Sequence, residues 1–400
     1  MNRLSRISFD IFLTSVTPIL GWFLIGILVD KNLINIFSLV YPMQFIISAI
    51  YSIFGTGANI SAIKDNNKNS IFSGFILGAL LGAFILGSIV FNIDKYILFM
   101  NMDIKIYRVF AIYAIIQFFL QLLLNLSLCK LYYEDNNKCA NKYSFLFNLI
   151  NFLSLIIMSL VTKNQIIITS VSLIATTIFT LIMISKTVKI TRFKINLKNC
   201  IKYDSVYLFA EISMFIIYLL GFKNAFDFGE KYILATSFTT LITDTQWDTF
   251  DSITTAAQID ISKNRFNYKE HRKNAYKLLG ILLSTVFLMF IILFKFYNLN
   301  MKLTLIYFSF ELVNFAIYPV YRIKTCYLQL EYSALKTTTN KMIASILRFL
   351  ISLLPTPFCT GLGQVSSSIY QFISVKFLFN RNYELEENGI IKSRCKNDSL

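Results

Sequence analysis

The sequence is poor in charged residues, proline and histidine. Only 15% of its 400 residues are Asp, Glu, Lys or Arg, and it holds 5 Pro and 1 His. Soluble domains carry about 25% charged residues, so a water-soluble globule is excluded. A disordered or collagenous chain is excluded as well, because 56% of the residues are hydrophobic and 39 are Phe. Such an apolar chain must be buried in protein or in lipid.

Motifs of enzymes and metal sites are also missing. There is no G-x-S-x-G, H-E-x-x-H or G-x-x-x-x-G-K-[ST] pattern, so intramembrane zinc proteolysis and direct ATP hydrolysis find no support, and we expect a protein that is not an enzyme. The six Cys show no C-x-x-C spacing and are interpreted as free thiols. His271 lies in a basic stretch, NYKEHRKNAYK, and is interpreted as a solvated loop residue.

Long apolar runs are what the sequence does have. Twelve spans of about 20 residues would take about 240 positions, which leaves no room for a separate soluble domain. The first run continues to Val29 without a signal-peptide cleavage site, so we interpret it as a spanning helix. The sequence therefore predicts an all-α integral membrane protein with twelve transmembrane helices. The predicted spans are residues 9–29, 33–56, 71–93, 106–129, 143–162, 165–185, 205–222, 232–258, 278–296, 303–320, 333–354 and 360–379.

The net charge of +16 follows the predicted topology. With the amino terminus inside, 28 of the 38 Lys and Arg lie in or beside cytoplasmic segments and 9 lie in or beside outer loops. The positive-inside rule then places both termini in the cytoplasm. This distribution explains the positive charge without nucleic acid, and we expect a multi-pass protein of a bacterial inner membrane.

Weak internal similarity divides the chain into two halves. Ala58-Asn59-Ile60 recurs 199 residues later as Ala257-Gln258-Ile259, and the most basic predicted inner loop, residues 186–202, lies at the midpoint. Six helices return the chain to the same side of the membrane, so the halves would be parallel repeats of the kind found in secondary transporters. We predict two pseudo-symmetric six-helix lobes, 1–199 and 200–380, and a disordered cytoplasmic tail, 381–400.

Several short motifs resemble those of the multidrug and toxic compound extrusion (MATE) family of antiporters. They are Tyr41-Pro42, Gly55-Thr56-Gly57-Ala58-Asn59, Phe209-Ala210-Glu211-Ile212-Ser213-Met214-Phe215, Ala256-Ala257 and Leu353-Leu354-Pro355-Thr356-Pro357. The resemblance implies alternating access and export of amphipathic, cationic organic compounds in exchange for Na⁺ or H⁺. It also places the family's membrane-embedded glutamate on Glu211. Many members have an aspartate in the first helix, where this chain has Gly21 and no acid, so ion coupling through the first half would be absent or altered.

A row of carboxylates marks the eighth predicted span. Asp244, Asp248 and Asp251 have i, i+4, i+7 spacing and share one face of a helix. Facing lipid, the three would cost about 8 to 10 kcal/mol, so the face must meet a hydrated cavity, a cation or basic partners. Clustered carboxylates tend to hold a proton or a cation such as Na⁺. Ser237, Thr240, Thr255 and Gln258 extend the row, and Gln246 and Trp247 lie beside it as candidate substrate-cavity residues.

Two glutamates complete the predicted ion-coupling set. Glu211 and Glu311 lie between apolar residues in the middle of predicted spans, where an unpaired carboxylate is costly. For the aspartates of the eighth predicted span two alternatives remain open: the stretch is partly a loop, or its acids satisfy Arg348 or Lys side chains inside the bundle. For Glu211 and Glu311 the alternative is structural hydrogen bonding as protonated groups.

The predicted function is a monomeric, cation-coupled exporter of small molecules in a lipid bilayer. A flippase for a lipid-linked saccharide is the alternative, and a channel or a membrane receptor is a third reading. The row of acids favours organic cations over the other substrates.

Overall fold

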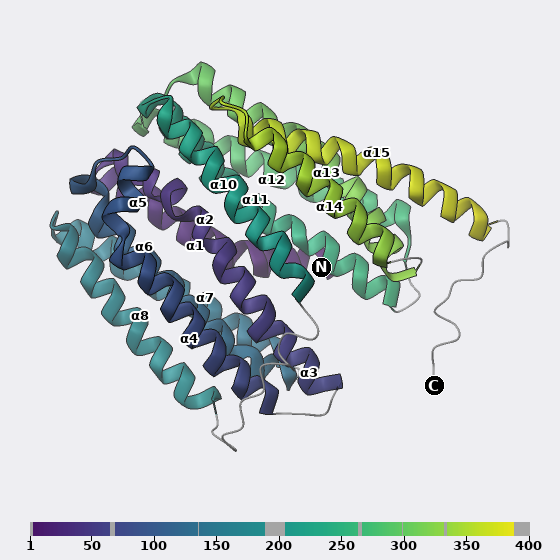
Figure 1. The fold of residues 1–400 in the computed structure, drawn as a ribbon, viewed down its shortest axis with the longest axis horizontal. Coiled ribbons are helices and arrows are strands. Elements are labelled where there is room, and N and C mark those ends of the chain that lie inside the picture. The colour runs from purple at the N-terminus through teal and green to yellow at the C-terminus, as the bar shows by residue number, and fades with distance from the viewer. Residues whose placement is uncertain are drawn as a thin grey trace. The chain divides into compact units, whose positions relative to one another are not determined.

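The computed structural model describes residues 3–64, 69–134, 136–188, 205–262, 266–297, 299–331 and 334–387, and every regular element within these ranges is a helix (Figure 1). The chain forms two compact units. The N-unit comprises residues 16–237, and the C-unit comprises residues 238–400 together with 1–15. The predicted boundary between lobes, after residue 199, lies outside the described residues, and the division into two six-helix lobes stays a prediction.

Ten described elements lie wholly in the N-unit, and the second half of α1 (Arg3–Leu28) also belongs to it. The ten elements are η1 (Lys31–Ile34), α2 (Asn35–Tyr51), the π-helix η2 (Ser52–Gly57), α3 (Ala58–Lys64), α4 (Asn69–Phe91), α5 (Ile93–Phe99), α6 (Ile104–Tyr133), α7 (Asn137–Val161), α8 (Gln165–Thr187) and α10 (Ser205–Asp227). Within this unit α6 packs against α2, α4, α7 and α8, and α10 packs against α2.

Five described helices form most of the C-unit, together with the first half of α1. The five helices are α11 (Glu230–Ser262), which begins in the N-unit, α12 (Tyr268–Tyr297), α13 (Met301–Glu331), α14 (Ala334–Ser352) and α15 (Cys359–Glu387). Helices α13, α14 and α15 pack against one another (Figure 1). A hydrophobic core joins α11 and α12 to them through buried residues such as Phe250, Leu279 and Phe315.

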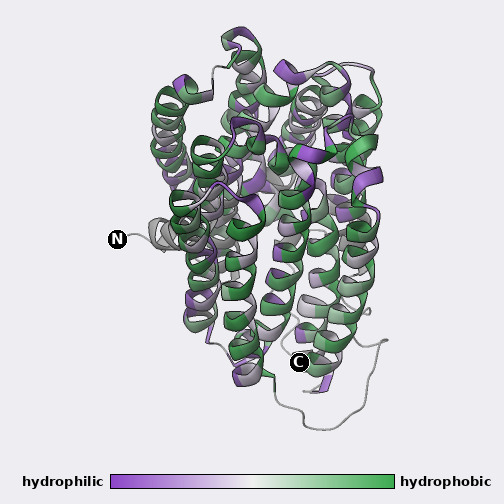
Figure 2. Ribbon diagram, turned by 90° about the vertical axis from the view of Figure 1, so that its left-hand side faces the viewer, coloured by the Kyte–Doolittle hydropathy of each residue, from purple (hydrophilic) through white to green (hydrophobic). Residues whose placement is uncertain are grey.

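Each of the twelve predicted spans falls on a helix. Among the described residues, seven helical segments are long and apolar enough to cross a membrane: Lys31–Ala62, Asn69–Phe91, Ile104–Tyr133, Lys138–Val161, Gln165–Thr187, Tyr268–Tyr297 and Met301–Tyr327. Figure 2 shows hydrophobic residues along much of the length of the helices. The five other predicted spans coincide with α1, α10, α11, α14 and α15, and their crossing of the membrane stays a prediction.

A row of glycines brings α4 close to its neighbours. A Cβ atom on Gly74 would lie 2.0 Å from the carbonyl oxygen of Phe54, and one on Gly78 or Gly82 would lie 2.8 Å from Leu126 or 2.6 Å from Leu122. Small residues at four-residue spacing allow this close approach of helices in membranes. Because these glycines carry no side chain, α4 is able to pack closely against η2 and α6.

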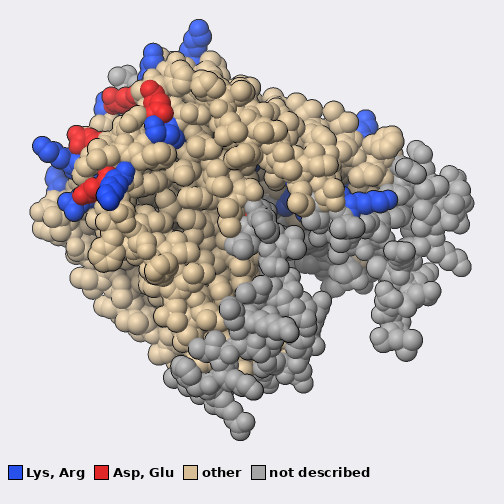
Figure 3. All heavy atoms as spheres, viewed as in Figure 1, with Lys and Arg blue, Asp and Glu red and all other residues tan. Residues whose placement is uncertain are grey.

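Charged residues gather where α5 joins α4 to α6. On the face seen in Figure 3 they lie together at upper left, and the described surface along the helices shows few others. Asp94 pairs with Arg108 at 3.2 Å, and Asn101 Nδ2 donates to Asp227 Oδ1 at 2.5 Å. The Tyr96 hydroxyl donates to the Leu39 carbonyl at 2.7 Å, and burial raises its pKa, so it stays protonated as a donor. These contacts fix one end of the N-unit.

Two sequence-based interpretations are wrong in detail. His271 lies in the first turn of α12, where it pairs with Asp260 Oδ2 at 3.2 Å, and is not a loop residue. Helix α15 continues to Glu387, so residues 381–387 are helical where disorder was expected, and the rest of the predicted tail lies outside the described residues. Both helices extend because neither Pro nor Gly interrupts residues 266–279 or 364–387. The cysteines Cys129, Cys139, Cys326 and Cys359 are free thiols as predicted, and Cys200 and Cys395 lie outside the described residues.

Candidate functional site

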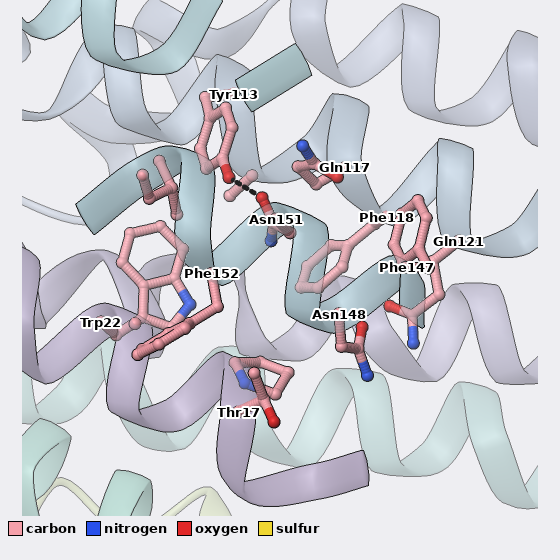
Figure 4. Close-up of a pocket in the computed structure, with 14 residues that line it drawn as sticks. Thr17, Trp22, Tyr113, Gln117, Phe118, Gln121, Phe147, Asn148, Asn151 and Phe152 are labelled. Atoms are coloured by element: carbon pink, nitrogen blue, oxygen red, sulfur yellow. Dashed lines mark hydrogen bonds between the residues drawn. The ribbon is translucent and has the colours of Figure 1, made fainter. Parts of the chain in front are cut away.

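The N-unit encloses a small cavity of about 60 Å³ between α1, α6 and α7 (Figure 4). Its wall combines aromatic rings with amide and hydroxyl groups. The lining residues are Thr17, Pro18, Gly21, Trp22, Tyr113, Ala114, Gln117, Phe118, Gln121, Phe147, Asn148, Asn151, Phe152 and Leu155. A cavity of this size and polarity accommodates a few water molecules or one small ligand group.

Hydrogen bonds hold one wall of this cavity in place. The Tyr113 hydroxyl donates to Asn151 Oδ1 at 2.5 Å, and the Ser172 hydroxyl donates to the same oxygen at 2.7 Å. One turn further along, Gln117 Nε2 donates to Thr176 Oγ1 at 2.9 Å. Helices α6, α7 and α8 are thus joined by buried polar groups, which fixes the orientation of the Asn151 amide.

All the residues that line this cavity are uncharged. Gly21, the position at which the resemblance implies an aspartate, lies in the wall, and a Cβ atom there would meet only Phe152 at 3.6 Å. The cavity therefore has space for a side chain at residue 21 but supplies no carboxylate. Any ligand here is recognised through hydrogen bonds and ring contacts rather than through opposite charge.

The C-unit contains a hydrogen-bond network around Glu311. Trp247 Nε1 on α11 donates to Glu311 Oε2 on α13 at 2.9 Å. Gln364 Nε2 on α15 donates a longer bond to the same oxygen at 3.5 Å, and Arg348 on α14 donates to Gln364 Oε1 at 3.5 Å. Arg348 and Gln364 are buried, at 8% and 9% exposed, whereas Glu311 and Trp247 are partly buried.

Two further aromatic rings pack against Trp247, whose indole binds the Glu311 carboxylate. The Trp247 ring lies 4.9 Å from both Phe315 and Tyr318, measured between ring centroids. Ring faces attract cations, and the carboxylate is bound to the Trp247 indole. This pairing of rings with an acid suits an organic cation.

Two buried amides adjoin this network. Gln246 is 1% exposed and Asn314 is 0% exposed, and neither side chain has a hydrogen-bond partner in the part of the chain that the structure describes. Gln246 precedes Trp247, and Asn314 lies one turn after Glu311. Buried polar groups are almost always hydrogen-bonded, so these two amides have unused capacity for a polar ligand or water.

The other predicted residues are placed less completely. Asp244 and Thr240 lie on α11 with partly buried side chains, and Glu211 lies partly buried on α10 of the N-unit. The predicted eighth span is one continuous helix from Glu230 to Ser262. The side chains of Asp248, Asp251, Thr255 and Gln258 lie outside the described residues. Among the described residues, no group of three His, Cys, Asp or Glu is arranged to hold a metal ion, so the predicted Na⁺ site at the three aspartates stays untested.

The predicted site residues included Trp247, but neither the polar residues that line the N-unit cavity nor Gln364, the second partner of Glu311. Tyr113, Gln117 and Gln121 recur at four-residue spacing, and Asn148 and Asn151 at three, within otherwise apolar helices. This spacing places each set on one helical face, so it was a detectable signal. Gln364 carried no comparable signal, because its contact with Glu311 joins α15 to α13.

Solved structures provide the comparison with known proteins. The chain matches an inward-facing multidrug resistance MATE family transporter of the MOP superfamily at 12% identity and a TM-score of 0.65, covering 96% of both chains. It matches a MATE protein in complex with MaD3S at 14% identity and a TM-score of 0.66, again over 96% of both chains. A MOP superfamily transporter from Pyrococcus furiosus, described as having a binding pocket of reversed polarity, matches at 14% identity and a TM-score of 0.64, over 94% of this chain and 95% of the other.

No family model matches the chain, and no curated protein matches it by sequence. The structural similarity nevertheless extends over nearly the whole length of both proteins, which confirms the resemblance at the level of the fold. The chain is a multi-pass integral membrane protein with the fold of the MATE transporters of the MOP superfamily.

Proposed function

We propose that the chain is a secondary transporter, not an enzyme, that exports amphipathic organic cations in exchange for Na⁺ or H⁺ by alternating access. It would act as a monomer in a bacterial inner membrane, with both termini in the cytoplasm. The fold supports a transporter. The observation that carries the choice of substrate is the carboxylate of Glu311, within the spanning segment Met301–Tyr327 and in contact with the Trp247 indole at 2.9 Å.

The surroundings of Glu311 support two roles for its carboxylate. Its negative charge and the neighbouring rings of Trp247, Phe315 and Tyr318 attract a cationic, partly aromatic substrate. A carboxylate in a bundle is also able to accept a proton or a cation, and its affinity for that ion must differ between inward and outward states to drive export. Asp244, Asp248, Asp251 and Glu211 are the other proposed coupling acids.

Coupled transport in proteoliposomes tests the proposal. Purified protein is reconstituted with an imposed Na⁺ or H⁺ gradient, and uptake of a fluorescent organic cation is followed. We expect Glu311→Gln and Asp248→Asn to reduce gradient-driven transport at least tenfold. Glu270→Gln is the matched control, because Glu270 is an exposed acid in the first turn of α12. Undiminished coupled transport in Glu311→Gln and Asp248→Asn would exclude both acids from the mechanism.

The uncharged cavity of the N-unit favours a second candidate, a flippase for a lipid-linked saccharide. Amide and hydroxyl groups without a carboxylate suit an uncharged polar head group better than a cation. The two functions are distinguished by the compound that the protein transports. Inhibition of organic-cation uptake by a second organic cation supports the exporter, whereas transbilayer movement of a lipid-linked saccharide without cation uptake supports the flippase.

A further inference from the structure

The C-unit buries a lysine where α12 begins and α15 approaches its end. Lys324 on α13 is 6% exposed, and its ammonium lies between two aromatic rings. The Nζ atom is 5.3 Å from the centroid of the Tyr268 ring and 4.8 Å from that of Phe379, and the two rings are 5.3 Å apart. Within the described part of the chain, the ammonium makes two favourable contacts, which are these contacts with the rings, and it forms no ion pair.

Two further cations adjoin Lys324. The Arg272 guanidinium carbon lies 5.8 Å from the Tyr268 ring that Lys324 also contacts, and Lys376 lies one turn before Phe379 on α15. Both have exposed side chains and act on Lys324 as like charges. Two acids of this region are described: Asp260, which pairs with His271, and Glu270, which is exposed in the first turn of α12. One buried cation and two exposed ones are therefore grouped, and none of the three forms an ion pair with a carboxylate among the described residues.

Ring faces compensate a buried ammonium only in part. A charge taken out of water is strongly disfavoured unless it is paired and hydrogen-bonded, and a cation–π contact is weaker than an ion pair with an anion. The ammonium keeps three N–H donors. An oxyanion that binds Lys324 together with Arg272 and Lys376 would accept hydrogen bonds from these N–H donors. It would also reduce the repulsion among the three cations.

We propose that Lys324, Arg272 and Lys376 form a binding site for a phosphate group at this end of the C-unit. A phosphate has several acceptor oxygens and a charge that matches three cations, and point charges such as lysine are common phosphate ligands. The positive-inside distribution predicts that this end faces the cytoplasm. The phosphate then comes either from a soluble phosphate compound or from the head group of an anionic lipid. This site is separate from the Glu311 network and from the transport function proposed above.

Thermal unfolding of the full chain in detergent tests the site with inorganic phosphate as the probe. We expect phosphate to raise the unfolding temperature of the wild type in a saturable manner, compared with chloride at equal ionic strength. Lys324→Gln should weaken the apparent phosphate affinity at least tenfold. Lys302→Gln is the matched control, because Lys302 is an exposed lysine at the other end of the same helix, and its affinity should equal that of the wild type.

A second arm identifies the source of the phosphate. The variants are reconstituted in phosphatidylcholine with or without phosphatidylglycerol, and retained lipid is measured by native mass spectrometry. Retention of phosphatidylglycerol that is lost in Lys324→Gln but kept in Lys302→Gln, with no effect of free phosphate, supports the site with a lipid as its ligand. The proposal is overturned if Lys324→Gln and Lys302→Gln behave alike toward both probes. Should Lys324→Gln fail to fold, Arg272→Gln replaces it. It should weaken binding at least threefold, and wild-type binding in that variant overturns the proposal.

Discussion

The indole nitrogen of Trp247 donates a hydrogen bond to Oε2 of Glu311 across 2.9 Å, and this bond joins α11 to α13 inside the C-unit. It holds a carboxylate in a spanning segment in one orientation, and the indole itself packs against the rings of Phe315 and Tyr318. Gln364 and Arg348 extend the contact to α15 and α14. Helices α11, α13 and α15 thus meet at one acid, and α14 is linked to it through Gln364.

The strength of this contact is measurable by a double-mutant cycle. Trp247→Phe and Glu311→Gln should each lower the free energy of unfolding in detergent. The double variant should lose less than the sum, with a coupling energy of about 1 to 2 kcal/mol, because the bond involves a charged acceptor. Strictly additive losses would show that the two side chains do not interact in the folded protein.

The close approach of α4 to Phe54 predicts that Gly74 tolerates no side chain. A Cβ atom on Gly74 would lie 2.0 Å from a backbone oxygen, so Gly74→Ala forces a helix to move and should cost about 1 to 3 kcal/mol of unfolding free energy. Gly87→Ala on the same helix is the control, because a Cβ atom there meets nothing within 4 Å. We expect that variant to be neutral or slightly more stable. Equal unfolding temperatures for the two variants would contradict the glycine row as the basis of the packing.

The uncharged N-unit cavity predicts a gain of function on adding an acid. Gly21→Asp introduces a carboxylate into a wall where the Cβ atom fits. The variant should be less stable than the wild type without a cation, and Na⁺ should restore about 1.4 kcal/mol at ten times its Kd. The measurement is the unfolding temperature in NaCl against choline chloride. Gly21→Asn is the uncharged control of the same shape, and equal Na⁺ dependence in both variants would show that the acid does not reach a cation site.

Asn151 is predicted to be the key residue of the same cavity wall. Its Oδ1 accepts hydrogen bonds from both Tyr113 and Ser172. Asn151→Leu leaves two buried hydroxyls without this acceptor and should lower the unfolding free energy by about 2 to 4 kcal/mol. Tyr113→Phe removes one donor only and should cost about 1 kcal/mol. Chemical denaturation of both variants checks this order, and the reverse order would contradict the assigned network.

Much of the secondary structure was predictable from the sequence. Each predicted span coincides with helical residues. In the bilayer core no water is present to bind the backbone, so a run of about 20 apolar residues pairs its N–H and C=O groups by forming a helix. The ends were less predictable: α12 begins at Tyr268, ten residues before the predicted span, and α15 continues to Glu387. Hydropathy marks where a segment is apolar, whereas a helix ends where caps and helix breakers end it.

The candidate sites divide in the same way. The sequence alone determined that Glu311 is a costly acid and Trp247 an aromatic residue in apolar helices, and that residue 21 is a glycine. These features follow from composition and local spacing. Only the tertiary structure decided that Trp247 and Gln364 bind the Glu311 carboxylate and that Lys324 lies between Tyr268 and Phe379. These contacts join different helices. Apolar periodicity specifies which face of a helix is buried, but the identity of its neighbour follows from how all the helices pack at once.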